Sequence, residues 1–444
     1  MGIYLNPRNK GFREAVSSEI YVDKTGLIAY TNRYMNTEQK YICVSRPRRF
    51  GKSMTLKMLA AYYSRGCDSS DLFKGFRIEE NETFRKHLNQ YDVIYLNMQQ
   101  FLIEAENQDV TQYLTEEVVG ELWEEFGGLL KERKIGLAAA FRKIYAKTDK
   151  QFIFLIDEWD CVMRERQESE ALQKRYLDFL RNLLKDQPYV ALAYMTGILP
   201  VKKYGEHSAL NMFTEYSMTD QDVFEEYTGF TEEEVKELCS RFDMDFLRTG
   251  SWYDGYVFTR FRHIYNPKSV TESMRRRKFS SYWTSTETYD ALKIYMDMDF
   301  DGLREDVVRM LGGGHVKVNT LSFRNDMNNF RIKDDILTLL IHLGYLAYDS
   351  ESEEAFIPNK EIIREFENAM KAGGWPEIIR VLKASEKLLA DTSAGDGQSV
   401  AEALEGYAGE IVLAGINYDR DNKDKPHSCV IEKFRPPIEK SGKC

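Results

Sequence analysis

Metal ligands and disulfide partners are scarce in this chain. Its 444 residues include only six cysteines and six histidines. The cysteines lie far apart with no CxxC pair, and the histidines show no ligand spacing such as HExxH. We therefore expect neither a metal cage nor a disulfide framework, and we interpret the cysteines as reduced structural thiols.

Long apolar segments and an excess of positive charge are also missing. No window holds eighteen consecutive apolar residues, so we expect no membrane-spanning helix, and the N-terminal residues 1–7 lack the apolar core of a signal peptide. These absences predict a cytoplasmic protein. The formal net charge of −10 excludes a general attraction to nucleic acid or anionic lipid, so any such contact must come from a local patch.

Short apolar segments that alternate with helical patterns are what the chain does contain. The segments expected to form buried strands are residues 41–44, 93–96, 152–156, 189–196 and, more weakly, 213–217. The segments expected to form helices are residues 53 to about 65, about 108–146 and about 168–185. This alternation predicts an α/β fold in which a parallel sheet has helices on both faces.

Two motifs follow strands of this expected sheet. The segment 46–53, RPRRFGKS, follows the first strand, and Asp157 and Glu158 follow the apolar run 152–156. Ligands bind such sheets at the carboxyl ends of the strands. The first motif is typical of a phosphate loop, whose backbone N–H groups and helix N-terminus face an anion. The second supplies carboxylates for a metal and for a water molecule, so the pair predicts a Mg-nucleotide site.

Each residue of this site has an expected role. Lys52 is expected to be catalytic and to reach the β- and γ-phosphates, and Ser53 is expected to ligate Mg²⁺. Asp157 is expected to hold the metal through water, and Glu158 to orient and deprotonate the attacking water. The residues expected to contact the nucleotide are Arg49, Phe50, Gly51, Lys52, Ser53, Met54 and Thr196.

The loop departs from the usual pattern GxxxxGK[ST]. Arg46 takes the place of the first glycine, and Pro47 removes one backbone donor. Alone, the segment is compatible with a basic turn in which Lys52 is only solvated, and Glu158 is compatible with a surface acid at a strand end. The apolar strand before Asp157 favours the nucleotide site over both alternatives.

Further residues are candidates for supporting roles. Thr196 closes its strand and either senses the γ-phosphate or simply eases the turn, and Asn211 is a weaker candidate for the same role. Arg260 and Arg262 are candidates for an arginine finger, which an oligomeric ATPase would need.

Two segments rich in basic or aromatic residues have a structural and a functional interpretation. The basic run 275–278 beside aromatic residues could touch a nucleic-acid backbone, but a solvated loop over a core is the more common arrangement. The aromatic segment 252–256 is expected to pack a turn rather than to contact a ligand.

These motifs resemble the bacterial AAA-ATPase-like family. The segment 46–53 is similar to the phosphate loop of that family, whose members use RPRRFGKS in place of the glycine-first form. The other similar segments are residues 21–25, 155–160, 196–199, 229–231, 252–256, 265–267 and 282–283. The resemblance is close over about residues 1–285 and looser to about residue 370. It implies an ASCE-type P-loop ATPase core with helical and winged-helix-like additions.

The length of the chain is too great for a single core and predicts several domains. We expect a P-loop ATPase core at 1–222, a helical extension at 223–298, a winged-helix-like module at 299–384 and a small α+β tail at 385–444. In the extension, Thr231 followed by three glutamates is typical of a helix start. In the module, a helical pattern that includes Ile336, Leu339 and Leu340 is followed by a hairpin pattern.

The tail resembles a PD-(D/E)XK nuclease-like domain, which usually follows the ATPase in this family, with its middle missing. Such a nuclease needs an acid on one strand and an acid-x-lysine on the next. Only Asp421-Asn422-Lys423 fits the second pattern, and it lies in a charged turn. We therefore interpret residues 385–444 as a degenerate, inactive remnant.

The leading hypothesis is a cytoplasmic ATPase that binds ATP and Mg²⁺ and uses hydrolysis to switch a C-terminal partner-binding region. The alternative is a nucleotide-binding regulatory or adaptor protein with little turnover, which contacts protein or DNA. The expected partners are ATP, further copies of this chain and a protein or nucleic acid, with no membrane. The sequence does not decide whether the protein prefers ATP or GTP.

Overall fold

The computed structural model describes residues 2–106, 108–201, 210–220, 222–283, 302–323, 330–372 and 391–403, together with 292, 295, 298, 300, 387 and 388. The chain divides into two compact units, Met1–Trp375 and Pro376–Cys444. In the second unit, residues 391–394 and 397–403 are helical. Residues 404–444, which include the acid-x-lysine segment 421–423, lie outside the described residues.

A five-stranded parallel sheet forms the centre of the first unit. Its strands are β1 (Tyr41–Ser45), β2 (Asp92–Asn97), β3 (Phe152–Asp157), β4 (Val190–Gly197) and β5 (Thr214–Tyr216). They lie in the order β2-β3-β4-β1-β5, and every neighbouring pair is parallel. β4 therefore separates the strand before the phosphate loop from the strand before the acids. This order is that of an ASCE-type P-loop NTPase and confirms the predicted α/β fold.

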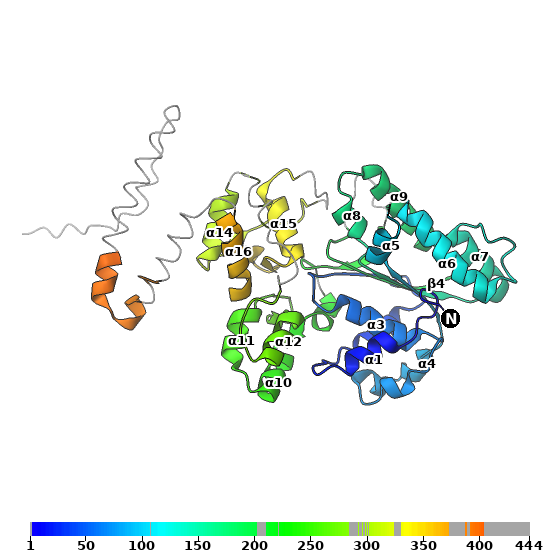
Figure 1. Ribbon diagram of the computed structural model, residues 1–444, viewed down its shortest axis with the longest axis horizontal. Helices are drawn as coiled ribbons and strands as arrows, with labels where there is room; N and C mark the ends of the chain where they lie inside the picture. The colour runs from blue at the N-terminus through cyan, green and yellow to red at the C-terminus, as the bar shows by residue number, and fades with distance from the viewer. Residues whose placement is uncertain are drawn as a thin grey trace, which may run out of the picture. The chain divides into compact units, whose positions relative to one another are not determined.

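Helices cover both faces of this sheet (Figure 1). The helices of one face are α1 (Lys10–Val16), α3 (Lys52–Tyr63) and α4 (Phe84–His87), with α2 (Leu27–Tyr34) in the same apolar core. The helices of the other face are α5 (Met98–Glu104), α6 (Val110–Phe126), α7 (Leu137–Thr148), α8 (Cys161–Glu165) and α9 (Glu170–Leu184). Alternate residues of β3 serve the two faces: Leu155 joins the α3 core, whereas the ring of Phe154 lies 5.2 Å from that of Phe141 in α7.

The helical periodicity after the phosphate loop is confirmed, since α3 ends at Tyr63, before Gly66. The single helix expected over 108–146 is wrong. Two helices, α6 and α7, replace it, with a break between Phe126 and Leu137 that contains Gly127, Gly128 and Gly136. Glycine disfavours a helix interior, and the break lets the two amphipathic helices pack on each other.

The chain beyond residue 222 first forms a helical group. It contains η3 (Asp222–Tyr227), β6 (Phe230–Thr231), α10 (Glu232–Phe242), α11 (Phe246–Tyr253), β7 (Ile264–Tyr265) and α12 (Pro267–Arg276). The predicted helix start at Thr231 is confirmed as a capping box, in which the Thr231 N–H donates to Glu234 at 2.8 Å and the Glu234 N–H to the Thr231 hydroxyl at 3.4 Å.

A second group follows at residues 303–372. It contains α14 (Leu303–Leu311), β8 (Val316–Lys317), α15 (Lys333–Leu343), β9 (Ala347–Asp349), β10 (Glu354–Phe356) and α16 (Lys360–Ala372). The predicted helix and hairpin are α15, β9 and β10, and β8 adds a third antiparallel strand in the order β8-β10-β9. Residues 335–342 of α15 are all buried, so this helix is a core element. Among the described residues, no helix is long and apolar enough to cross a membrane.

One buried carboxylate joins α16 to the segment that precedes the second group. Glu361 is 1% exposed, and it accepts hydrogen bonds from the N–H groups of Tyr282 and Trp283 at 2.6 and 3.0 Å. Burial raises the pKa of the Glu361 carboxyl to about 6, although the two N–H donors oppose the shift. The folded chain therefore binds this proton more tightly than the unfolded chain does.

The Glu361 proton should make the stability depend on pH. Between about pH 4.5 and pH 6, the free energy of unfolding should fall as the pH rises, by about 2 kcal/mol at most, because the folded state retains the proton longer. Glu361→Gln keeps an acceptor for both N–H groups and should remove this slope. Urea unfolding from pH 4.5 to 7 measures it, with Glu14→Gln, whose side chain is 68% exposed, as the control. An unchanged slope in Glu361→Gln would contradict this assignment.

Candidate functional site

The segment Arg46–Ser53 joins the carboxyl end of β1 to the first turn of α3. Gly51 caps the helix with φ +93°, in the left-handed region that favours glycine, and a Cβ added there would meet no atom within 4 Å. The backbone is thus open to approach where helix N–H groups and the helix dipole favour an anion. The one glycine of the motif therefore lies at the N-cap of α3, where its positive φ and missing side chain leave the backbone open.

Lys52 is buried even though it begins α3. Its Nζ donates to the main-chain oxygens of Arg46 and Pro47, each at 2.9 Å. Burial lowers the pKa of the Lys52 ammonium, and the carboxylates of Glu158 and Asp157 oppose that shift. The next two residues of the helix, Ser53 and Met54, are exposed.

Arg46, which replaces the first glycine of the usual pattern, is a structural cation. It is fully buried. Its guanidinium donates to the main-chain oxygens of Ser45 and Tyr216 and to the Thr228 hydroxyl, at 2.8–2.9 Å. Its Cζ also lies 5.1 Å from the ring centre of Phe258. Burial lowers the pKa of Arg46 to about 10, so it stays charged at neutral pH. The sequence pattern did not indicate this role.

Arg49 and Phe50 contact later parts of the chain. Arg49 has φ +68°, and its guanidinium donates to the main-chain oxygen of Tyr282 at 3.0 Å. The Phe50 ring is buried edge-on against that of Tyr256, with 5.0 Å between ring centres. These two side chains, expected to contact a nucleotide, thus connect the loop to the helical group.

Asp157 and Thr196 meet across neighbouring strands. Asp157 ends β3 and is 1% exposed, and its Oδ1 accepts hydrogen bonds from the Thr196 hydroxyl at 2.6 Å and from the Glu158 N–H at 3.1 Å. The structure therefore brings together the expected metal ligand and the expected γ-phosphate sensor, at the carboxyl ends of β3 and β4.

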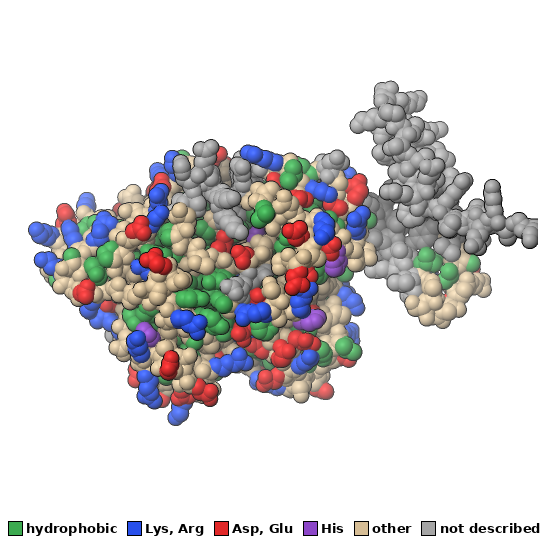
Figure 2. Space-filling model, turned by 180° about the vertical axis from the view of Figure 1, so that it is seen from behind, with side chains coloured by type: hydrophobic (Ala, Val, Ile, Leu, Met, Phe, Trp, Pro, Cys, Tyr) green, Lys and Arg blue, Asp and Glu red, His purple; other side chains and the backbone are tan. Residues whose placement is uncertain are grey.

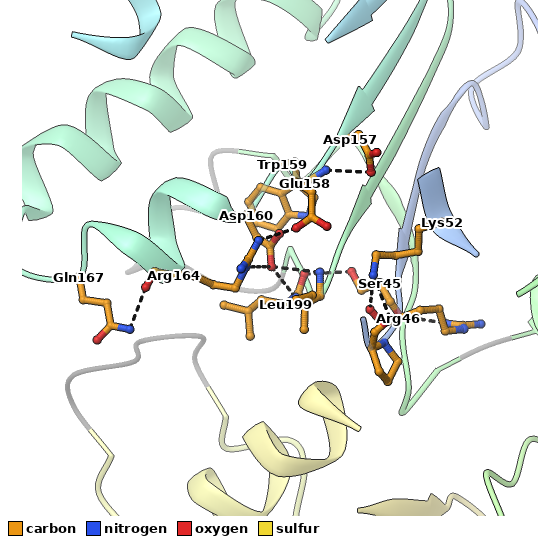
Figure 3. A network of polar contacts seen from close by, with 12 residues as sticks. Ser45, Arg46, Lys52, Asp157, Glu158, Trp159, Asp160, Arg164, Gln167 and Leu199 are labelled. Atoms are coloured by element: carbon orange, nitrogen blue, oxygen red, sulfur yellow. Dashed lines mark hydrogen bonds and ion pairs between the residues drawn. The ribbon is translucent and has the colours of Figure 1, made fainter. Parts of the chain in front are cut away.

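Glu158 and Asp160 share one buried arginine, Arg164 (Figure 3). Arg164 NH2 lies 2.5 Å from Glu158 Oε2, and Arg164 Nε lies 3.1 Å from Asp160 Oδ2. Asp160 Oδ2 also accepts from the N–H groups of Ile198 and Leu199. Burial alone would lower the pKa of Arg164, but Asp160 and Glu158 raise it. Asp160 and Arg164 were not predicted, although their i, i+4 spacing after the acidic motif was a usable signal.

One cavity of about 840 Å³ unites the two motifs. Its lining includes the loop residues Arg48–Thr55 and, on the side of the second motif, Glu158. Asp157 and Thr196 do not line it and lie buried at the strand ends. Lys52, Ser53 and Glu158, three of the residues expected at a nucleotide site, all line this cavity.

The far end of the cavity is formed by segments distant in sequence. The N-terminal segment 18–22 contributes Ile20, Tyr21 and Val22, and the helical group contributes Phe230 and residues of α12. Lys24, in the segment 21–25 that resembles the family, binds Glu234 of α10 at 2.6 Å. The sequence showed some of these segments only as phrases similar to the family, and it did not indicate that they enclose a cavity.

The other candidates lie outside this cavity or are paired within the chain. Asn211 is exposed and accepts from Lys185 at 3.1 Å. Arg260 lies beside Glu225, and Arg262 is bound to Asp349 at 2.5 Å.

The basic run 275–278 is exposed, and two of its four residues lie beside an acid. Arg275 and Arg276 of α12 both lie beside Glu272, at 3.7 and 2.8 Å. Tyr253 and Tyr256 of the aromatic segment are buried. On the face shown in Figure 2, positive and negative side chains are interspersed.

Comparison with known proteins finds a family similarity in the N-terminal part of the chain. Residues 11–205 match the family described as "Predicted AAA-ATPase". The "Uncharacterized protein in vnfD 5'region" of Azotobacter chroococcum mcd 1 is 25% identical over 277 residues, which is 60% of this chain and 51% of the relative. The chain thus spans about half the length of the curated relative that it matches.

Among solved structures, AMPPCP-bound DnaA from Aquifex aeolicus has a TM-score of 0.30 and 13% identity, over 87% of this chain and 96% of that chain. The Aeropyrum pernix ORC2 protein, in ADPNP-ADP complexes, has a TM-score of 0.30 and 11% identity, over 80% and 97%.

The buried Arg46 should matter for stability far more than its neighbour Arg48. Arg46→Ala removes three hydrogen bonds and leaves a cavity, so it should lower the free energy of unfolding by about 3 kcal/mol or more. Arg48→Ala, at an exposed position of the same loop, should lower it by less than about 1 kcal/mol. Urea unfolding compares the two, and equal losses would show that Arg46 does not anchor the loop.

Proposed function

We propose that this chain is a Mg²⁺-dependent ATPase that uses hydrolysis to switch the region after residue 222. The observation that carries this proposal is the single cavity lined by Lys52, Ser53 and Glu158. In the proposal, Lys52 binds the β- and γ-phosphates, and the loop residues 49–54 hold the nucleotide through their backbone. Glu158 orients and deprotonates the attacking water, and Thr196 acts on the γ-phosphate through Asp157.

Two residues are proposed for Mg²⁺: Ser53, which lines the cavity, and Asp157, which is buried at the end of β3. Among the described residues no three His, Cys, Asp or Glu side chains form a metal cage. A magnesium ion on a nucleotide does not need one, because phosphates and water supply most of its ligands. Ser53 and Asp157 would hold the ion, and both hydrogen bonds described for Asp157 use Oδ1, which leaves Oδ2 for a metal-bound water. Bound there, Mg²⁺ would neutralise charge on the phosphates.

The switching part of the proposal is supported by contacts between the loop and later segments. The Gly229 N–H donates to the Phe50 oxygen at 3.1 Å, and Trp283 Nε1 donates to the Arg48 oxygen at 3.4 Å. A Cβ on Gly344, which ends α15, would lie 2.7 Å from the Pro47 ring. A nucleotide that shifts this loop would therefore press directly on the helical group and on α15.

The alternative remains a nucleotide-binding regulatory protein with little turnover. One observation favours it: Glu158, the expected base, is bound to Arg164. The partner of either protein is a further copy of this chain, a protein or a nucleic acid. For nucleic acid, the burial of α15 removes the most obvious recognition helix and leaves local basic contacts. A cytoplasmic location belongs to the same proposal.

ATP turnover should separate these two functions. Glu158→Gln should lose hydrolysis by about 100-fold or more while ATP binding changes little, because the base acts only in the chemical step. Lys52→Ala should lose binding and hydrolysis together. Steady-state hydrolysis with and without Mg²⁺ and DNA, beside ATP binding by calorimetry, measures both.

The matched controls are Glu165→Gln and Lys74→Ala, at exposed positions that do not line the cavity. Wild-type binding without turnover would favour the regulatory protein. Failure of the wild type to bind ATP would contradict both functions.

Nucleotide binding should also slow hydrogen exchange in the segments that contact the loop from later parts of the chain. With ATP and Mg²⁺, hydrogen exchange should slow at residues 282–283 and 344–346 as well as at the loop, because these segments touch its backbone. Exchange in α6, on the far face of the sheet, should stay the same. Glu158→Gln prevents turnover during the measurement, and Lys52→Ala should show no change. Protection confined to residues 46–58 would contradict the switching proposal.

A further inference from the structure

We propose that Arg164 is a positioning residue that holds the Glu158 carboxylate out of use until it is released, with Asp160 as the fixed anchor of the same guanidinium. This inference rests on the proposed hydrolysis, in which Glu158 is the base. It adds a residue of α8 that the motifs did not indicate.

The two carboxylates bind different nitrogens of Arg164. NH2 binds Glu158 Oε2, and Nε binds Asp160 Oδ2 (Figure 3). The arginine side chain is only 7% exposed, so both bonds lie away from bulk water. A planar guanidinium can hold two acids at once and keep one when the other leaves.

The bond to Asp160 is the permanent one. Asp160 is fully buried, and its Oδ2 also accepts the N–H groups of Ile198 and Leu199 at 3.0 and 2.8 Å. Movement of this carboxylate would leave two backbone donors and a buried charge without partners, which is costly. Arg164 is therefore tied to the end of β4.

The bond to Glu158 is the one that can open. The Glu158 side chain is 23% exposed and lines the cavity, and Arg164 is the one side-chain partner that the described residues give it. When Glu158 leaves, Arg164 still has Asp160, so no buried charge is left alone. Release is thus far cheaper than the breaking of an isolated buried pair.

The backbone around Glu158 confines this release to the side chain. Glu158 has φ +54°, in the left-handed region that is strained for a side-chain-bearing residue. The main-chain oxygen of Glu158 accepts from the Cys161 N–H, and the Trp159 N–H donates to the main-chain oxygen of Thr196, both at 3.0 Å. With the chain fixed on both sides, the carboxylate moves by rotation of its own side-chain bonds.

We call the bond between Arg164 and Glu158 the latch. It must open before the chemical step. In hydrolysis, the water oxygen bonds to the γ-phosphorus, the bond from that phosphorus to ADP breaks with its electron pair on ADP, and one water proton passes to Glu158. A carboxylate oxygen that is held by a guanidinium must first give up a charge-assisted hydrogen bond. A bond of this kind corresponds to a factor of about ten to one hundred in rate.

Arg164→Lys tests the latch. Lysine can keep the buried i, i+4 pair with Asp160, but it has a single nitrogen and cannot bind both acids in the same fork. We expect kcat for ATP to rise about tenfold, with KM and the urea midpoint little changed. The double variant Arg164→Met with Asp160→Asn should raise kcat likewise, because asparagine still accepts both backbone N–H groups.

Two controls separate a latch from packing. Asp160→Asn alone leaves the Glu158 bond in place and should not raise kcat. Arg175→Lys, at a 65% exposed arginine on α9, should change nothing. In a Glu158→Gln background, Arg164→Lys should have no effect on turnover.

The outcomes also separate this inference from the proposed function. If the wild type binds ATP but does not turn it over, Arg164→Lys should start turnover, and its failure to do so would overturn the latch. A fall or no change in kcat in both Arg164 variants would overturn it as well. The proposed function is judged separately, by ATP binding and by Glu158→Gln.

Discussion

The structure of the site depends on hydrogen bonds between two carboxylates that follow or end β3 and the residues at the end of β4. β4 lies between the strand that leads to the phosphate loop and the strand that leads to the acids. Asp157 holds Thr196, and Asp160 holds the N–H groups of Ile198 and Leu199. These two carboxylates fix where the chain leaves both strands. They therefore fix Glu158, which lies between them, against the cavity.

Two buried cations hold the segment Arg46–Ser53 against the sheet. Arg46 binds the backbone of β1 and β5, and Lys52 binds the two carbonyl oxygens at the start of the loop. Both keep the loop in place through hydrogen bonds from charged donors, which are stronger than those between neutral groups. Gly51 combines a positive φ with open space around the position of a Cβ, and Arg49, also with a positive φ, is held by the bond from its guanidinium to the main-chain oxygen of Tyr282.

Much of this arrangement could be predicted from the sequence. The buried strands have continuous apolar segments, and α3 has a clear helical face, so the sheet and the positions of both motifs were accessible. The break between α6 and α7 was not, because helical patterns continued on both sides of it. The partners of Arg46 and Arg164 were also inaccessible. They come from tertiary contacts, such as Thr228 and Phe258 for Arg46, that no local pattern records. The nuclease-like tail remains a prediction.

The burial of α15 bears on the winged-helix-like module, which remains a prediction. A helix that reads DNA must present one face to solvent, yet residues 335–342 are all buried. Its C-terminal Gly344 lies against Pro47, and its next residue, Tyr345, packs edge-on against Trp283 at 4.9 Å. Trp283 in turn is held by Glu361 of α16 and donates to the Arg48 oxygen. The helix α15 therefore packs inside the chain against the loop, through Gly344 and Pro47 and through Tyr345 and Trp283.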